Sequence, residues 1–202
     1  MIIGLTGGMG CGKSTAARFF EELGFRRVDS DALVRDHVLT QPDIIAEARN
    51  RHGDVVITPA GLHESASGPT IDRAALGRVL FADDTKLRDW EDLVLPRLFE
   101  HWRALLDSDP VADWIVETPL LFEKSLEKWF DFIVCVASST ATQYARLAER
   151  GVSHTLAAQR ISKQLPLATK IDKSDFVLSN DGTLEFLRDQ IRALVRTLRA
   201  RR

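Results

Sequence analysis

The chain has 202 residues, of which 45% are hydrophobic and 28% are charged, and its formal net charge is −2. This length suits one domain of ordinary size, or one core with a subsidiary lobe, and it is sufficient to bury a substantial core. The near-neutral charge argues against nucleic acid as the main partner, and no apolar run approaches the length that spans a bilayer.

The two cysteines, Cys11 and Cys135, show neither a metal-ligand spacing nor a disulfide framework, so a reducing compartment is expected. The apolar N-terminus is interpreted as a first strand and not as a leader, because no basic segment precedes it. We therefore expect a cytoplasmic, monomeric protein without nucleic-acid or membrane partners.

The first stretch with a chemical signature is residues 7–14, GGMGCGKS, which fits the phosphate-loop pattern G-x-x-x-x-G-K-[ST]. An apolar run over 1–6 predicts a strand before it, and a helical pattern begins at Lys13. Glycines permit the positive φ angles and close approach with which backbone N–H groups surround a polyphosphate. The N-terminus of the following helix favours the same anion. This stretch is predicted to bind a nucleotide.

Three side chains of the loop have separate predicted properties. Lys13 supplies a positive charge for the β- and γ-phosphates, and Ser14 supplies a hard oxygen ligand suited to Mg²⁺. Cys11 lies beside a helix N-terminus, so we expect a lowered thiol pKa and a loop that oxidation would block. The residues predicted to contact the nucleotide here are Gly8, Met9, Gly10, Cys11, Gly12, Lys13, Ser14 and Thr15.

Short apolar strands alternate with helical patterns along the rest of the chain. Further strands are expected at 25–29, 114–117, 132–136 and 176–178. Helices are expected at 16–23, 31–38, 42–51, 72–81, 87–105, 140–150, 156–163 and 184–198, with Pro96 kinking or dividing the long one. Residues 58–70 form the most loop-like segment. This alternation indicates a parallel sheet with helices on both faces.

Ligands of such folds gather at the carboxyl ends of the strands. Asp31 follows the second predicted strand closely, Glu117 ends the third, and Asn180 and Gly182 follow the last. The core is expected at 1–41, 108–139 and 173–202. Two helical stretches interrupt it, and we predict an acceptor-binding lobe at 42–107 and a lid at 140–170.

The phosphate loop alone does not distinguish kinases from ATPases or GTPases. The guanine-reading pattern N-K-x-D is absent, and the chain is too short for large mechanical domains. A kinase that acts on a small metabolite is therefore favoured, and it needs a group that positions the acceptor hydroxyl and cations that spread charge on the transferred phosphoryl group.

Six strings occur in one order along the chain: GLTGGMGCGKST, VDSDALVR, IDRAALGRVLF, ETPLLFE, QYARLAERG with QRISKQ, and DFVLSNDGT. From end to end, this series resembles the dephospho-coenzyme A kinase family. The resemblance implies an α/β, phosphate-loop kinase-like three-layer fold with a five-stranded parallel sheet, a helical acceptor lobe and a helical lid. It also implies the substrates ATP and 3′-dephospho-coenzyme A, with Mg²⁺, and phosphorylation of the ribose 3′-hydroxyl to give coenzyme A.

The resemblance implies roles for residues after the second and third strands. Asp31 would face the acceptor hydroxyl, although it could instead cap a helix. Arg35, one helical turn further on, would hold an acceptor phosphate or pair with a nearby carboxylate. Leu120 is expected to contact the acceptor. Glu117, where the family usually has Asp, would lie near Mg²⁺ together with Ser14, or form a structural ion pair.

The remaining predicted site residues lie in the lid and the last loop. Arg146 and Arg150 are spaced i, i+4 on a predicted helix and would close over the phosphates, although exposed arginines are often only solvated. Asn180 and Gly182 would lie by the adenine, or form an ordinary turn. The residues predicted to act in catalysis are Asp31, Lys13 and Arg146.

Two departures from the family pattern fall in the expected acceptor lobe. Leu95 precedes Pro96 where the family commonly has His, and the 61–70 connection is longer than usual. Two alternative functions remain open from the residues alone: another small-metabolite kinase, such as a nucleoside or nucleotide kinase, and a nucleotide-binding regulator without turnover.

Overall fold

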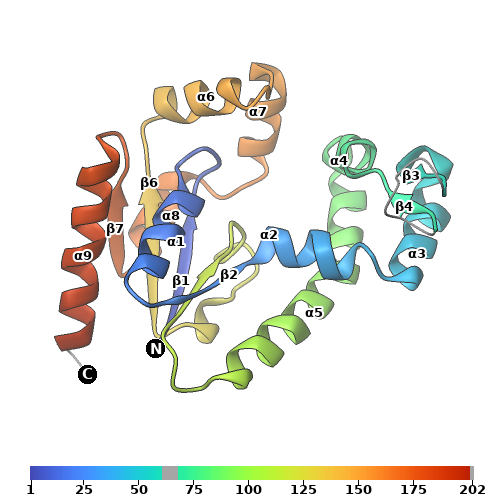
Figure 1. Cartoon of the computed structure of the whole chain (residues 1–202). Coiled ribbons are helices and arrows are strands. Elements are labelled where there is room, and N and C mark those ends of the chain that lie inside the picture. The colour runs from blue at the N-terminus through green and yellow to red at the C-terminus, as the bar shows by residue number, and fades with distance from the viewer. Residues whose placement is uncertain (61–67, 201–202) are drawn as a thin grey trace. The chain divides into compact units, whose positions relative to one another are not determined.

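A parallel five-stranded sheet lies at the centre of the compact unit formed by Met1–Asp29 and Asp109–Arg202 (Figure 1). The computed structural model describes residues 1–60 and 68–200. The strands are β1 (Ile2–Gly7), β2 (Arg26–Asp29), β5 (Trp114–Glu117), β6 (Phe132–Ala137) and β7 (Phe176–Ser179), in the order β2-β5-β1-β6-β7. In the register of β2 and β5, Asp29 lies beside Glu117. The expected fold class is thus confirmed.

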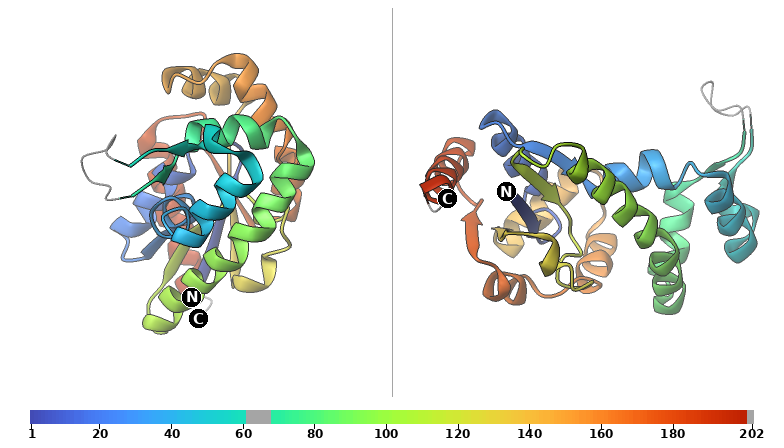
Figure 2. Two further views of the ribbon diagram at one scale, coloured as in Figure 1. Left: turned by 90° about the vertical axis from the view of Figure 1, so that its right-hand side faces the viewer. Right: turned by 90° about the horizontal axis from the view of Figure 1, so that it is seen from below.

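Helices cover both faces of this sheet. The helices are α1 (Lys13–Glu22), α6 (Thr140–Glu149), α7 (His154–Ser162), α8 (Leu167–Lys173) and α9 (Leu184–Ala200), with a short 3₁₀ turn at Glu127–Trp129. Figure 2 shows α1 and α9 on one face and α8 on the other. This is the three-layer arrangement that buried parallel strands require.

The core of this part is formed by strand residues and by the apolar faces of α1 and α9. Its most buried members include Ile3, Leu5, Phe20, Ile115, Val134, Leu187 and Ile191. The apolar periodicity expected for α9 is confirmed, since the buried side chains of that helix recur at helical spacing. Burial of each large apolar side chain contributes about 1.5–3 kcal/mol, so these layers hold the strand ends in place.

The chain divides into two compact units, Met1–Asp29 with Asp109–Arg202 and Ser30–Ser108. We call them the sheet unit and the helical unit. The helical unit contains α2 (Ser30–Leu33), a π-helix (Val34–Val38), α3 (Pro42–His52), a 3₁₀ turn (Asp54–Val56), β3 (Ile57–Thr58), β4 (Thr70–Ile71), α4 (Arg73–Phe81) and α5 (Asp84–Ser108). Residues 30–41, which we expected in the core, belong to the helical unit.

The helical unit has a core of its own. It buries Val38, Ile44, Ala48, Val56, Leu76, Leu80, Trp90 and Val94. Pro96 lies inside α5, and the expected division of that helix there is wrong. A proline in a helix interior costs about 3 kcal/mol, but Val94 and Leu98 are buried on either side of it, so an uninterrupted apolar stripe offsets this cost.

Three short elements were not expected from the sequence. Strands β3 and β4 pair antiparallel through only two residues each, and α8 has seven residues. Elements this short carry little periodicity. Because α8 packs on β1 and β6, the last residues of the predicted lid belong to the sheet unit's core. The 61–70 connection falls largely outside the described residues.

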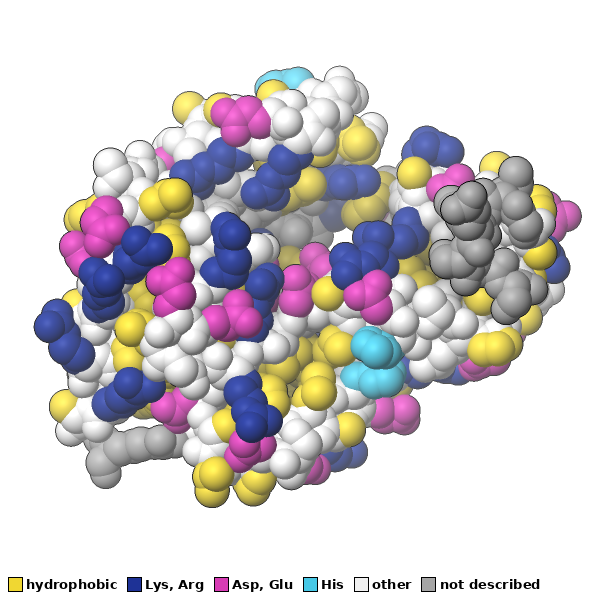
Figure 3. Space-filling view, in the orientation of Figure 1, with side chains coloured by type: hydrophobic (Ala, Val, Ile, Leu, Met, Phe, Trp, Pro, Cys, Tyr) yellow, Lys and Arg dark blue, Asp and Glu magenta, His cyan; other side chains and the backbone are white. Residues whose placement is uncertain are grey.

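The surface carries both signs of charge. Figure 3 shows Lys and Arg side chains interspersed with Asp and Glu, as the net charge of −2 leads one to expect. Within residues 1–60 and 68–200, no helix combines the length and apolar character needed to cross a membrane.

Candidate functional site

The glycine-rich loop between β1 and α1 packs closely against Gln143 and Asn180. Gly10 and Gly12 have φ angles of 80° and 90°. A Cβ atom at Gly12 would lie 2.2 Å from Nδ2 of Asn180, and one at Gly10 would lie 2.8 Å from the backbone oxygen of Gln143. Glycine is therefore required at both positions, by backbone conformation and by close approach. The result is a fixed loop at the carboxyl end of β1.

The loop leads into a helix end that suits an anion. Gly12 precedes α1 and makes no side-chain cap, and the N-terminus of such a helix favours a phosphate. Nζ of Lys13 donates to the carbonyl oxygens of Gly7 at 3.3 Å and Gly8 at 3.1 Å. These contacts keep the ammonium group beside the loop, where it can meet phosphate oxygens.

Ser14, Glu117 and Arg27 form a hydrogen-bonded chain next to the loop. The Ser14 hydroxyl donates to Oε1 of Glu117 at 2.7 Å, and Nη2 of Arg27 donates to Oε2 of Glu117 at 3.0 Å. The same Nη2 donates to Oδ2 of Asp29 at 3.1 Å. Glu117 thus accepts from a hydroxyl at one oxygen and from a guanidinium group at the other. The contact with Arg27 is the kind of ion pair that we expected as the alternative to a place near Mg²⁺.

The donor set fits a metal that arrives with a nucleotide. The described residues contain no group of three or more His, Cys, Asp or Glu side chains that could hold a metal ion. Mg²⁺ commonly takes one or two protein oxygens together with phosphate oxygens and water. The Ser14 hydroxyl, with Glu117 behind it, is the group in this chain that would hold such an ion.

Arg146 on α6 lies against the glycine-rich loop. Its Nη1 donates to the carbonyl oxygens of Gly10 at 3.4 Å and Cys11 at 3.5 Å and to the Ser138 hydroxyl at 3.2 Å. Its Nη2 donates to the carbonyl oxygen of Asn180 at 2.8 Å. One guanidinium group therefore joins α6, the loop and the segment after β7.

Arg150 does not share this environment. It is exposed and forms the C-terminal cap of α6, with φ −87° and ψ 8°. The α-helix ends at Glu149, and the hydrogen bonds to the glycine-rich loop described above come from Arg146. Arg146 is brought to the loop, and Arg150 is not.

Asn180 connects the last strand to the loop. Its buried side-chain Nδ2 donates to the backbone oxygen of Cys11 at 2.8 Å. Its backbone carbonyl oxygen accepts from the Ser138 hydroxyl at 3.0 Å. Its Oδ1 is buried and has no hydrogen-bond partner among the described residues. Gly182 is exposed, beside the Phe186 ring. Asn180 is more than an ordinary turn residue, because it fixes the position of the loop.

Asp181, between them, ties the last loop to the start of α6. Its carboxylate accepts from the Ser139 amide at 2.9 Å and from the Ser139 hydroxyl at 3.0 Å. Hydrogen bonds from Thr142 and then from Ser139 hold the pKa of Asp181 below its usual value. The segment therefore has a fixed connection to the first turn of α6.

The expected activation of Cys11 is wrong. The residue is fully buried, and burial raises the pKa of its thiol, although the charge of Lys13 opposes that change. Desolvation of the thiolate exceeds the stabilisation from nearby cations and amides. The second thiol, Cys135, is buried in β6, and burial raises its pKa to about 11. Both cysteines are packing residues at neutral pH.

Asp31 and Arg35 lie at the start of the helical unit. Asp31 is exposed in the first turn of α2. Arg35 falls in the π-helix that begins at Val34, directly after α2, so the expected helix is present but is not α-helical throughout. Nε and Nη2 of Arg35 each lie 2.6 Å from an oxygen of Asp36, and this contact lowers the pKa of Asp36.

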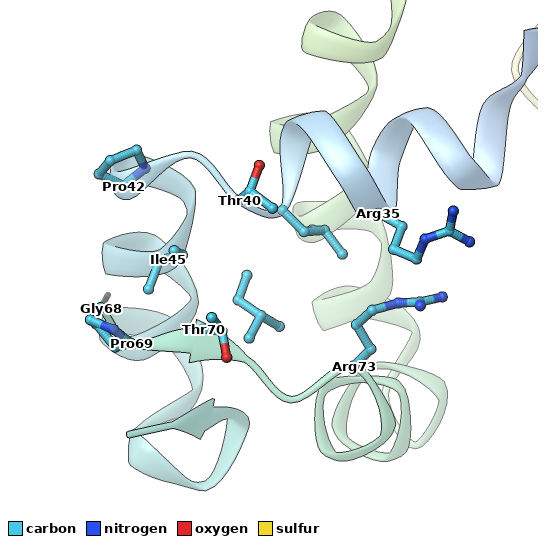
Figure 4. A pocket seen from close by; sticks show the side chains of 10 residues that line it. Arg35, Thr40, Pro42, Ile45, Gly68, Pro69, Thr70 and Arg73 are labelled. Atoms are coloured by element: carbon cyan, nitrogen blue, oxygen red, sulfur yellow. The ribbon is translucent and has the colours of Figure 1, made fainter. Parts of the chain in front are cut away.

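A pocket of about 510 Å³ lies within the helical unit. Arg35 and Arg73 line one end of it, and Figure 4 shows their guanidinium groups extending in the same direction. The rest of the lining is largely apolar and includes Leu39, Ile45 and Ile71. Such a cavity can take an elongated ligand with an anionic end and an uncharged body.

Leu120 lies in the loop after β5, half-buried. Pro119 before it is held through its carbonyl oxygen, which accepts from Nζ of the fully buried Lys170 at 2.6 Å. Lys170 also lies 2.7 Å from Oε1 of Glu123. This buried ion pair fixes the loop that carries Leu120, and no local pattern in the sequence indicates it.

Arg27 and Arg73 were also missed, although each had a signal in the sequence. Arg27 lies two residues before Asp29 in a strand, so the two side chains share a face. Arg73 is the first residue of α4, after the Asp72 cap. A cation at a helix N-terminus is unfavourable to the helix dipole, which indicates a role other than helix stability.

The sheet order, the three layers and the glycine-rich loop before α1 define a phosphate-loop kinase fold. Shikimate kinase from Acinetobacter baumannii has this fold, with a TM-score of 0.52 at 14% identity over 100% of this chain and 94% of its own. The chain belongs to the dephospho-CoA kinase family, because the family model described as CoaE: Dephospho-CoA kinase matches residues 1–185. The family resemblance expected from the sequence is confirmed.

Relatives agree with this family assignment. The dephospho-CoA kinase of Leifsonia xyli is 36% identical over 203 residues, which cover 98% of each chain. That of Arabidopsis thaliana is 34% identical over 98% of this chain and 84% of its own. The crystal structure of TT1252 from Thermus thermophilus has a TM-score of 0.79 at 29% identity and covers 98% of this chain and 97% of its own.

Proposed function

We propose that the protein transfers the γ-phosphoryl group of ATP to the ribose 3′-hydroxyl of 3′-dephospho-coenzyme A, giving ADP and coenzyme A. The observation that carries this proposal is the glycine-rich loop with Lys13 and the Ser14–Glu117 pair, in a chain of the dephospho-CoA kinase family. The loop supports the nucleotide, and the family supports the acceptor.

In this proposal the sheet unit binds ATP. Lys13 and the amides of residues 8–15 hold the phosphates, and Arg146 spreads charge on the transferred group. Ser14, with Glu117 behind it, would hold a Mg²⁺ ion, whose charge would offset that of the phosphates. Asn180 and Gly182 are assigned to the adenine side, where the unpartnered Oδ1 of Asn180 is suited to accept from an amino group.

Asp31 is assigned to the acceptor hydroxyl. A carboxylate is too weak a base to deprotonate a ribose hydroxyl before transfer, but it can orient the hydroxyl and accept its proton late in a loose transition state. Asp31 follows Asp29, the last residue of β2, by two residues, so its Cα lies within about 7 Å of that strand end.

The pocket of the helical unit is assigned to the rest of the acceptor. The diphosphate of dephospho-coenzyme A would lie between Arg35 and Arg73, since guanidinium groups bind phosphate oxygens through paired N–H donors. Its pantetheine arm would lie along Leu39 and Ile45. Leu120 is kept as a further acceptor contact.

A coupled assay of ADP release across acceptors tests the proposal. We expect release that depends on Mg²⁺ and is stimulated by dephospho-coenzyme A, and not by nucleosides or nucleoside monophosphates. Stimulation by a nucleoside or a nucleoside monophosphate alone would favour a different metabolite kinase. Binding of ATP without turnover of any acceptor would favour a regulator. A cytoplasmic, monomeric state stays a prediction, which cell fractionation and light scattering test.

A further inference from the structure

The guanidinium group of Arg27 faces three carboxylates of the sheet unit. Its Nη2 lies 3.0 Å from Oε2 of Glu117 and 3.1 Å from Oδ2 of Asp29, and its Nη1 lies 3.7 Å from Oε2 of Glu21. The Arg27 side chain is 19% exposed, and that of Glu117 is 9% exposed. Partial burial strengthens such charge-assisted contacts relative to those on an open surface.

Glu117 determines where the Ser14 hydroxyl proton points. The hydroxyl has one proton, which it donates to Oε1 of Glu117 at 2.7 Å. Both lone pairs of Ser14 are therefore directed away from Glu117 and are available to a cation. A Glu117 carboxylate that turned away would release this proton and change the orientation of the ligand oxygen.

Removal of Arg27 would leave the Glu117 carboxylate without its contact at Oε2. Asp29 and Glu117 are register partners on adjacent parallel strands, so their negative charges would repel each other. A glutamate side chain has several rotatable bonds, so a second contact helps to keep its carboxylate in place. Arg27 supplies that contact at Oε2, opposite the oxygen that Ser14 uses.

We propose that Arg27 is a positioning residue for the nucleotide-bound Mg²⁺. By holding Oε2 of Glu117, it keeps the lone pairs of Ser14 directed to the ion, and Glu117 acts through Ser14 and water without binding the ion directly. This inference rests on the proposed use of MgATP. Groups behind a metal ligand commonly change metal affinity about 10- to 100-fold when they are removed.

Calorimetric titration of ATP, with EDTA and then with Mg²⁺, tests the inference. The quantity of interest is the dissociation constant of ATP in EDTA divided by that in Mg²⁺. This ratio reports how strongly the metal and the nucleotide favour each other's binding. We expect Arg27→Met to lower this ratio about 10-fold, with ATP binding in EDTA close to that of the wild type. Arg27→Lys should keep it within about threefold, because the positive charge remains.

Arg26→Met is the matched control on the same strand. Arg26 forms an ion pair with Asp109 at 2.5 Å and lies over the Trp114 ring, away from Glu117. Both methionine variants lose an ion pair, so both are expected to lower the melting temperature. Only Arg27→Met should change the metal coupling. An unchanged ratio in folded Arg27→Met would overturn the inference and leave Arg27 with a structural role.

A double-mutant cycle separates this inference from the proposed function. In a Glu117→Gln background, Arg27→Met should change the ratio of dissociation constants by less than about twofold, because Arg27 acts through Glu117. A full effect in that background would contradict the inference. If the wild type bound ATP equally with EDTA and Mg²⁺, or did not bind it, the proposed function itself would fail.

Discussion

Arginine side chains of the candidate site lie in both units of the molecule, but those in the sheet unit are held differently from Arg35 in the helical unit. In the sheet unit, Arg146 and Arg27 reach groups far away in the sequence, and both are partly buried. In the helical unit, Arg35 is exposed and contacts its own neighbour, Asp36. The first arrangement is fixed by tertiary structure, whereas the second can exchange its partner.

This difference has a consequence for binding. A phosphate that enters the glycine-rich loop meets donors already in place, so little reorganisation is needed. An anion that enters the helical unit's pocket must compete with the Asp36 carboxylate for Arg35. Exposed ion pairs are weak and screened by salt. The acceptor side should therefore be weaker and more sensitive to salt than the nucleotide side.

Lys13→Ala tests the fixed side of the comparison and should have the largest effect. Removal of a cation that stabilises the transferred phosphoryl group is expected to lower kcat/KM roughly 10³- to 10⁵-fold. Steady-state ADP release with dephospho-coenzyme A measures it, with circular dichroism as the check on folding. Loss of less than about tenfold would show that the loop does not hold the reacting phosphate.

Asp31→Asn tests the proposed link between nucleotide and acceptor. The amide can still donate and accept hydrogen bonds but cannot take the proton, so kcat should fall roughly 10²- to 10⁴-fold with ATP affinity kept. Single-turnover kinetics together with ATP titration separate the two quantities. Wild-type turnover in this variant would remove Asp31 from the mechanism.

Arg73→Met tests the helical unit's pocket. Loss of a charge-assisted hydrogen bond to a phosphate should raise KM for dephospho-coenzyme A roughly 10- to 100-fold, with KM for ATP unchanged. Arg78→Met on the same helix is the control, since Arg78 is exposed and does not line the pocket. Equal effects of both variants, or a change confined to ATP, would place the acceptor elsewhere.

The buried thiols give the smallest effect at neutral pH. Neither Cys11 nor Cys135 should react with iodoacetamide at about pH 8 in the folded protein, and both should react in denaturant. Mass spectrometry after quenching reads this directly. Rapid alkylation of folded protein at Cys11, with loss of ATP binding, would restore the redox hypothesis.

Cys135 also predicts a dependence of stability on pH. Its folded pKa of about 11 lies above the usual value of 9.0, so the folded state binds more protons between these values. Its contribution is full below pH 9 and is lost as the pH rises towards about 11. The difference in unfolding free energy between wild type and Cys135→Ala should shrink over that range. A constant difference would contradict the shifted pKa.

The fold could be predicted because its signals are local and repeated. Apolar strand segments and the regular stripe of α9 indicate their own structure. The long helix was predicted with a kink or a division at Pro96, and the division is wrong because burial on both sides, which the sequence does not show, outweighs the missing hydrogen bond. The π-helix at Val34–Val38 has no sequence signal that would distinguish it from an α-helix.

The site was predicted only in part, because some of its residues belong to a local motif and others depend on contacts between distant segments. The glycine-rich loop lies in one stretch, and its template names each residue type. Arg27, Arg73 and Lys170 depend on partners that folding brings to them, or on a pocket formed by separate segments. Cys11 was interpreted from its helix-end position, which does not show burial. Long-range contacts thus mark the limit of what the residues alone could show.

Phosphorus-31 NMR of the product tests the central claim most directly. After incubation with ATP, Mg²⁺ and 3′-dephospho-coenzyme A, we expect one new phosphomonoester, coupled to the ribose 3′-proton, in equal amount to the ADP formed. ADP formed without that resonance, or a phosphate on any other atom of the acceptor, would contradict the account.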